Sequence, residues 1–304
     1  MAWKKSSPDD FFGCYWALHP TYLYVHFLPD TGIAWEYLRR NTEYQTDYDL
    51  FYKEYIAKQD VERKLCSISS LAQMGRRISL TRATARWEKL RDRASSIKNA
   101  IEQKWGLMEY QDYCLRGDEV NAFWSPQANK ASVELKASTP TSRDRRKQYP
   151  IPYFRAHVKT LFKAGVAHVV TRKRGYPHYF FGERIPLSIT RAEIRSNSQS
   201  KQAEAVRRRL IRYLGDDDDN EPADDPSGVI ANRKRHVECL RVYDGIREGA
   251  SRRQIAESIL GEEAIEELWN DPDCRLKNWF KYRLKRATEL IDGGYKDILS
   301  SADH

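Results

Sequence analysis

Side chains suited to contact with a polyanion gather on one face of the last amphipathic stretch of the chain, residues 275–292. At about 100° per residue, several polar side chains share this face and a basic pair flanks its N-terminal end. The face holds Asn278, Lys281, Tyr282 and Lys285, and the flanking pair is Arg275 and Lys277. Lysine and arginine neutralise phosphates or donate hydrogen bonds to guanine, and asparagine pairs with adenine. The chemistry of this face is that of a contact with double-stranded DNA.

The same stretch predicts the helix that presents this face. Its opposite side is apolar and consists of Leu276, Phe280, Ala287, Leu290 and Ile291. Glu289 is the only acid within residues 275–291, so the outward side carries nearly one sign of charge. A bundle helix whose charged face is merely solvated has much of the same pattern, and we keep it as the alternative interpretation.

A shorter amphipathic stretch, residues 249–262, predicts a supporting helix before the last one. Ser251 and Gln254 form the Ser-x-x-Gln pattern of a capping box. Ile255, Ala256 and Ile259 then recur at the spacing of an inward face. The two stretches together predict a helix-turn-helix variant, because the connection between them is longer than the usual tight turn.

The supporting helix also begins with two basic residues, Arg252 and Arg253. The N-terminus of a helix favours anions, since its first backbone N–H groups have no partner within the helix. We therefore predict phosphate contacts for both arginines, whereas the bases are expected to meet the last helix.

Residues for catalysis form no comparable set. The histidines and cysteines are scattered, without the spacing of a catalytic pair, a zinc knuckle or a disulfide framework. Glu134 and Lys136, with Asp118 upstream, faintly resemble the core of a Mg²⁺-dependent DNA nuclease. That pair lies in a polar segment predicted to be a loop, so a nuclease is a minor alternative. We predict no enzymatic activity, no cofactor and no metal site.

The charge balance also favours a nucleic-acid partner. The 304 residues carry a formal net charge of +9, which favours nucleic acid first and an anionic membrane second. No apolar run approaches the roughly 20 residues of a membrane-spanning helix. The N-terminal segment lacks the apolar core of a secretory signal. We expect a cytoplasmic protein, associated with the nucleoid and not with a membrane.

Helical periodicity dominates the chain outside one β-rich stretch. Helices are predicted within residues 31–59, with a turn near Asn41, and within 71–105, 201–214 and 233–249. Strands are predicted near 165–172, 176–182 and 185–190, with a hairpin turn at Gly175. We predict an α+β fold, mainly helical: a helical N-terminal domain, a small antiparallel β-hairpin or sheet, and a C-terminal helix-turn-helix-like bundle.

Two polar segments predict the organisation of the chain. Residues 127–150 are polar and basic, and we interpret them as a linker between an N-terminal region, 1–126, and a C-terminal domain, 151–304. Residues 216–228 read "DDDDNEPADDPSG", which predicts a flexible acidic insert. This insert lacks the central glycine and closing glutamate of a calcium loop, so we predict no metal there.

The C-terminal motifs resemble a known family. The segments "IREGASRRQIAESILGEE" and "LKNWFKYRLKRATELIDGGYKDIL" are similar to the DNA-binding domain of RovC-type transcriptional activators. The segment "AWEYLRRNTEY" is similar to the transcriptional regulator-like domain that accompanies it, and "WGL" and "FWSP" fit the usual lead-in. The acidic insert and the basic residues at 141–150 depart from the family pattern, so their roles cannot be carried over.

The resemblance implies promoter binding and transcription activation of bacterial genes, such as type VI secretion or mobile-element genes. It also implies a homo-oligomer, since a RovC-type protein is a hexamer. RNA polymerase is a further expected partner. A protein-binding adaptor or anti-activator built on the same helices is the main alternative, because a helix-turn-helix can also dock proteins.

In the N-terminal segment, Trp35 is expected in the core. Arg39 and Arg40 are expected either to bind DNA or to stabilise an interface.

Overall fold

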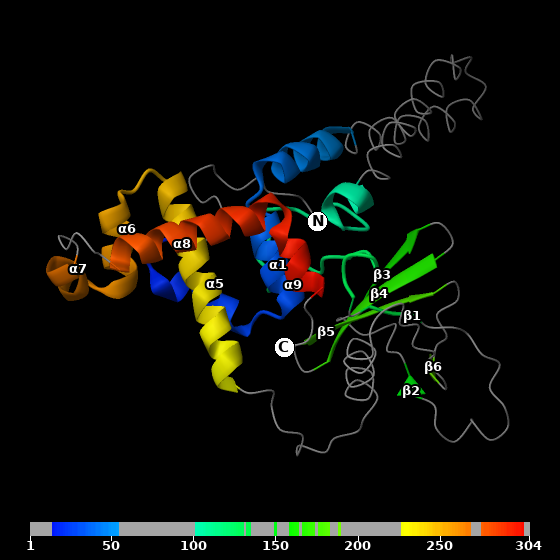
Figure 1. Ribbon diagram of the computed structural model, residues 1–304. Helices are drawn as coiled ribbons and strands as arrows, with labels where there is room; N and C mark the ends of the chain where they lie inside the picture. Colours follow the sequence, from blue (N-terminus) through cyan, green and yellow to red (C-terminus); the bar gives the residue numbers. More distant parts are fainter. Residues whose placement is uncertain are drawn as a thin grey trace, which may run out of the picture.

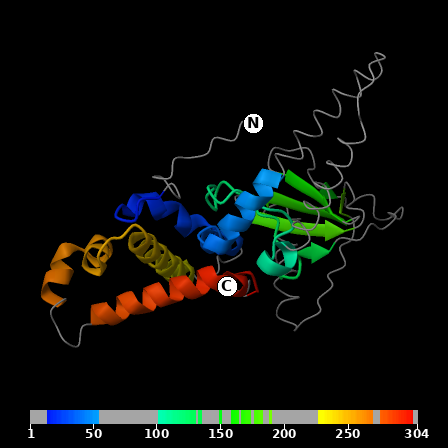
Figure 2. The same ribbon diagram turned by 90° about the horizontal axis from the view of Figure 1, so that it is seen from above.

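The computed structural model describes residues 14–54, 101–130, 132–134, 149–150, 158–163, 166–173, 176–182, 188–189, 226–268 and 275–300. Within these ranges the fold is α+β and mainly helical, as predicted (Figure 1). Most helices gather on one side of the molecule and the small sheet lies on the other, as the view from above shows (Figure 2). None of the helices in these ranges has the length and apolar character needed to cross a membrane.

The N-terminal segment forms short helices around a tight corner. A 3-10 helix, η1, spans His19–Phe27, and α1 spans Asp30–Leu38. The chain then turns, and residues 42–54 are helical again. At the corner, Oδ1 of Asn41 accepts a hydrogen bond of 2.9 Å from the backbone N–H of Tyr44, which caps the new helix. The predicted turn near Asn41 is confirmed.

The β-rich stretch forms the predicted hairpin, which pairs with further strands that the sequence did not indicate. Strands β4 (Val166–Lys173) and β5 (Tyr176–Gly182) pair in antiparallel register across residues 174–175. Strand β3 (Val158–Lys163), which was not predicted, pairs with β4, and the short β1 (Val133–Glu134) runs parallel to β5. The strand predicted near 185–190 is only β6 (Ser188–Ile189), which pairs with β2 (Tyr149–Pro150) in a separate two-stranded sheet.

The C-terminal segment is a run of helices that ends in a kink. They are α5 (Pro226–Arg247), α6 (Arg252–Leu260), α7 (Glu262–Leu268), α8 (Arg275–Glu289), a π-helical turn η3 (Leu290–Gly294) and α9 (Tyr295–Ser300). Because α5 begins at Pro226, the last residues of the predicted insert at 216–228 are helical. The kink in η3 is at Gly293, whose φ of 128° is a conformation that side chains with a Cβ rarely adopt.

Both ends of the chain build one core around α5. Val237 and Leu240 of α5 are buried in the same apolar cluster as Trp35 of α1 and Leu290 of η3. Between Val237 and Gly245, α5 is buried or half-buried at every position, so neighbours cover it on all sides. Burial of this kind explains why the periodicity of α5 is weaker than that of a surface helix.

Direct hydrogen bonds also connect the two ends. Nδ2 of Asn41 donates to the backbone carbonyl of Ile291 at 3.0 Å, and the hydroxyl of Tyr295 donates to the carbonyl of Trp105 at 2.9 Å. The regions 1–126 and 151–304, divided by sequence, therefore share a core and backbone contacts. The boundaries themselves stay a prediction.

Several predicted segments lie outside the described residues. They are the helix at 201–214, most of the helix at 71–105, most of the linker at 127–150, and residues 216–225 of the acidic insert.

Candidate nucleic-acid interface

The predicted DNA-contacting side chains lie together on the solvent side of α8. We call Lys277, Asn278, Lys281, Tyr282 and Lys285 the α8 outer face, and all five are exposed. The Tyr282 residue is 60% exposed, and the side chain of Lys285 is 72% exposed. Arg275 begins α8, but its side chain lies outside the described part of the structure.

One acid accompanies this face, as the sequence indicated. Nζ of Lys285 lies 3.8 Å from Oε1 of Glu289, and both side chains are largely exposed. Such a surface pair contributes at most about 1 kcal/mol, so a phosphate can compete for the lysine. The α8 outer face therefore keeps its positive character.

The opposite side of α8 packs as predicted. Phe280, Ala287, Leu290 and Ile291 are buried, and Leu276 is half-buried near the start of the helix. Phe280 forms a small cluster with Val242 of α5 and Ile255 of α6. The last helix is therefore held by both α5 and α6, which lie beside it in Figure 1.

Arg283 fixes α8 to α5, a role that the sequence did not reveal. Its Nε donates to Oε2 of Glu238 at 2.7 Å, and both side chains are mostly buried. Its guanidinium carbon lies 5.9 Å from the ring centre of Trp279 and 5.7 Å from that of Tyr282. These distances allow cation–π contacts with both rings. In the sequence, the indication of this contact is the position of Arg283 three residues after Phe280, beside the apolar side of the helix.

The helix α6 has the predicted capping box. The backbone N–H of Gln254 donates to Oγ of Ser251 at 3.3 Å, and Oε1 of Gln254 accepts from the backbone N–H of Ser251 at 3.0 Å. Ile255 and Ala256 are buried, and Ile259 is half-buried against the same cluster as Phe280. The prediction that this helix begins at a capping box and packs through these residues is confirmed.

The close approach of α6 to α5 occurs at Gly245. A Cβ at this position would lie 2.7 Å from Cγ1 and 2.8 Å from Cδ1 of Ile255. The absence of a side chain at Gly245 therefore lets Ile255 reach α5.

The two arginines at the start of α6 are exposed beside α8. Nε of Arg253 donates to Oε1 of Glu257 at 2.7 Å within the helix. The guanidinium carbon of Arg252 lies 6.0 Å from the ring centre of Phe280. The structure thus brings Arg252 next to α8, while Arg253 shares its charge with a carboxylate.

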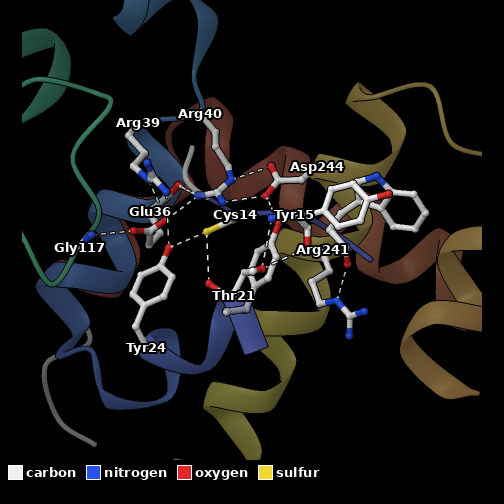
Figure 3. Close-up of polar contacts among 12 residues, drawn as sticks. Cys14, Tyr15, Thr21, Tyr24, Glu36, Arg39, Arg40, Gly117, Arg241 and Asp244 are labelled. Carbon is white, nitrogen blue, oxygen red and sulfur yellow. Dashed lines mark hydrogen bonds and ion pairs between the residues drawn. The ribbon is translucent and has the colours of Figure 1, made fainter. Parts of the chain in front are cut away.

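Arg39 and Arg40 belong to a buried ion network instead of a DNA surface (Figure 3). Nε and Nη2 of Arg40 donate to the two carboxylate oxygens of Asp244 on α5, at 2.8 and 2.7 Å. Arg39 and Arg40 also donate to Oε2 of Glu36, at 2.8 and 2.6 Å. Of the two roles that the sequence left open, the structure shows the stabilised interface, here between α1 and α5.

The network is closed by neighbouring hydrogen bonds. Oε1 of Glu36 accepts from the backbone N–H of Gly117 at 2.7 Å, and the hydroxyl of Tyr22 donates to Asp244 at 2.6 Å. Burial alone would raise the pKa of Glu36, but the two arginines outweigh it and lower that pKa to about 2. Glu36 is therefore charged at neutral pH, and the paired charges satisfy one another inside the protein.

The residues of the nuclease alternative belong to no metal-binding cluster within the part of the chain that the structure describes. Glu134 lies in strand β1 and not in a loop as predicted, and Asp118 accepts a hydrogen bond of 2.9 Å from Arg116. Lys136 lies outside the described residues. Within the described ranges, no group of three or more His, Cys, Asp or Glu side chains could hold a metal ion.

Comparison with known families identifies two segments of the chain. Residues 194–300 match the family described as a T6SS transcription factor, DNA-binding domain, and thus include α5 to α9. Residues 15–67 match the proteobacterial transcriptional regulator-like domain, which includes η1 and α1. A comparison with curated proteins finds no match. The two family matches confirm the resemblance drawn from the sequence and indicate a transcriptional regulator that carries a DNA-binding domain of the T6SS transcription-factor family.

Proposed function

We propose that the protein is a sequence-specific transcriptional activator that contacts promoter DNA through the α8 outer face. The observation that carries this proposal is the one-sided exposure of Lys277, Asn278, Lys281, Tyr282 and Lys285 on a helix packed on its other side. A helix of this kind fits the major groove, where each base pair presents a distinct pattern of donors and acceptors.

The proposed contacts divide into base contacts and phosphate contacts. Asn278 and Tyr282 supply hydrogen-bonding groups for base edges, and the lysines supply charge for bases or phosphates. Arg252 and Arg253 at the start of α6 contact the phosphates beside the groove. In this arrangement α6 supports α8 in the way that the first helix of a helix-turn-helix supports the second.

The biological setting follows from the family resemblance. We propose that the regulated genes are bacterial type VI secretion or mobile-element genes, and that the protein acts on the nucleoid in the cytoplasm.

Regulation of this kind needs no catalysis and no cofactor. Incubation of the protein with supercoiled plasmid and Mg²⁺ tests this part, because nicking of the plasmid would contradict it.

We also propose that the protein acts as a homo-oligomer and contacts RNA polymerase, as the resemblance implies. Exposed apolar side chains on and near η1 support a protein interface there: Leu18, Leu23 and Phe27 are exposed, and Phe27 is 84% exposed. The same observation favours the alternative of a protein-binding adaptor or anti-activator. Size-exclusion chromatography and crosslinking, with and without promoter DNA, distinguish an activator from an adaptor. Addition of promoter DNA should produce a protein–DNA complex for an activator and none for an adaptor.

The combined change Lys281→Ala and Lys285→Ala tests the proposed DNA contact. We expect promoter affinity to fall at least about tenfold, since two phosphate or base contacts are lost. Both side chains are exposed, so the thermal unfolding temperature should stay the same. The measurement is a gel-shift titration at two salt concentrations.

A matched variant controls for the loss of charge. Lys53→Ala with Lys130→Ala removes the same charge from exposed positions outside α8, and we expect it to bind the promoter almost normally. If the α8 variant keeps wild-type affinity at both salt concentrations, α8 is not the DNA-contacting helix.

A further inference from the structure

A groove between α5 and α8 lies next to the α8 outer face. Its volume is about 620 Å³, within the range of sites that hold ligand groups. On the α5 side it is lined by Asn232, Arg235 and His236, and on the α8 side by Tyr282, Lys285 and Arg286. The sequence predicted no groove between these helices, and Arg235 and Arg286 have no role in the proposed function.

The charges in the groove are unevenly placed. The lining from α5 and α8 carries the cations Arg235, Lys285 and Arg286 and one acid, Glu289, whereas the lining from α1 and α9 carries only the acids Asp30 and Asp297. Asp30 is neutralised by Arg233, whose Nη2 donates to it at 2.6 Å. The α5–α8 side of the groove is therefore the side that suits an anion.

The cations on that side are available to a ligand. Arg235 is exposed and makes no hydrogen bond or ion pair with any residue that the structure describes. Arg286 lies 3.6 Å from Glu289, in an exposed pair that shares its acid with Lys285. Exposed pairs of this length are weak and yield readily to a phosphate oxygen.

The groove is continuous with the proposed DNA contact. Tyr282 and Lys285 belong both to the α8 outer face and to the lining of the groove. Along α8, Tyr282, Arg286 and Glu289 follow one another at about one-turn spacing. A DNA strand that leaves the outer face past Tyr282 meets Arg286 on α8 and Arg235 on the facing wall.

We propose that this groove holds the sugar-phosphate backbone of the DNA strand beside the base pairs that α8 contacts, with Arg235 and Arg286 as its phosphate ligands. The proposal rests on the proposed function and extends the interface from α8 to α5. Phosphate contacts position a protein without reading sequence. The groove therefore contributes equally to the affinity for promoter and for unrelated DNA.

The double variant Arg235→Ala and Arg286→Ala tests the groove in the full-length protein. Binding to promoter and to unrelated duplexes should weaken by the same factor, about tenfold or more at moderate salt. The slope of log affinity against log salt concentration should become shallower by about 1.8, since each lost phosphate contact removes about 0.9. Fluorescence anisotropy across a salt series measures both quantities.

Three further variants distinguish a phosphate contact from a structural effect. Arg235→Lys with Arg286→Lys keeps the charges and should keep the salt slope. Lys234→Ala removes an exposed charge next to Arg235 but outside the groove lining, and should change neither quantity. Glu289→Gln releases Lys285 and Arg286 from their shared acid and should tighten binding to all duplexes.

The outcomes separate this proposal from the proposed function. If the Arg235 and Arg286 variant binds like wild type while the Lys281 and Lys285 variant does not, the groove proposal is overturned and the α8 contact stands. Unchanged binding in both variants contradicts the proposed function. A loss confined to promoter DNA would show base reading at the groove and would also overturn the phosphate assignment.

Discussion

Arginine has two opposite roles in this protein, and the neighbouring residues decide between them. Arg39 and Arg40 are fully buried among carboxylates, whereas Arg252 and Arg253 are exposed at the start of α6. A buried arginine is tolerated only with paired charges and satisfied hydrogen bonds, because the loss of hydration costs several kcal/mol per ion. Glu36 pairs with both arginines, and Asp244, more than 200 positions away along the chain, supplies a second carboxylate to Arg40.

Replacement of Arg40 by methionine should therefore be costly. Arg40→Met leaves Asp244 and Glu36 buried with fewer partners, and we expect the free energy of unfolding to fall by about 3–5 kcal/mol. Urea titration monitored by circular dichroism measures the change. Arg253→Met, which breaks the exposed pair with Glu257, is the control and should cost less than about 1 kcal/mol. Equal losses in the two variants would show that burial does not strengthen the network.

The same variant has an expected pH signature. Glu36 has a pKa of about 2 in the folded protein and an ordinary pKa of 4.5, so its contribution is complete above pH 4.5 and is lost as the pH falls toward 2. Loss of Arg40 moves the folded pKa up toward the ordinary value. The free energy of unfolding of Arg40→Met should therefore depend less steeply on pH between 4.5 and 2 than that of wild type.

At the scale of elements, the contact between α5 and α6 is sensitive to a single methyl group at Gly245. Gly245→Ala places a Cβ within 2.8 Å of Ile255, so α6 or Ile255 must move. We expect a loss of about 1–3 kcal/mol in the free energy of unfolding, as for other overpacked contacts. The loss should be much smaller when Ile255→Ala is already present, because the methyl group then has room. A double-mutant cycle by thermal unfolding measures this coupling, and simple additivity of the two changes would contradict the contact.

The sequence was a good guide to elements with local signals. The capping box of Ser251 and Gln254, the corner at Asn41 and the hairpin across residues 174–175 depend on side chains within a few positions of one another. Strand β3 was missed because its residues, "VKTLFK", alternate imperfectly and are fixed by pairing with β4. Pairing of this kind is a tertiary effect that a local pattern does not contain.

In the candidate site, too, some features could be predicted from local sequence and others depend on tertiary contacts. The α8 outer face could be predicted, since helical periodicity alone places Lys281 and Lys285 on one side. The partners of Arg283 and Arg235 could not be predicted, because they depend on which helix lies opposite; for Arg283, only its position beside the apolar side of α8 indicated a contact. An arginine in a basic run looks the same in sequence whether it faces Glu238 or solvent.

At the scale of the whole molecule, the matched segments at 15–67 and 194–300 contribute to one core. The helix α5 of the C-terminal segment is covered by η1 and α1 of the N-terminal segment as well as by α8. Burial of apolar surface is the main favourable contribution to folding. The stability of α6 and α8, the helices proposed to contact DNA, therefore depends on residues near the other end of the chain.

A fragment experiment tests this dependence. Residues 151–304 expressed alone should unfold at a much lower temperature than the full chain, or aggregate, because the face of α5 that contacts Tyr22 and Arg40 is uncovered. Co-expression with residues 1–126 should restore a soluble complex with cooperative unfolding. Differential scanning calorimetry of the fragment and the complex measures the difference. A fragment with the unfolding temperature of the full chain would show that the C-terminal segment is stable by itself.

The bidentate pair between Arg40 and Asp244 also limits how the two segments of this protein can be recombined with other domains. A chimera that joins this C-terminal segment to an unrelated N-terminal domain buries the carboxylate of Asp244 without its counter-charge. Such a fusion is viable only if the new domain supplies a cation at the same place, or if Asp244 is replaced at the same time. Exchange of either segment of this protein therefore requires the two segments to be engineered together as one electrostatically matched unit.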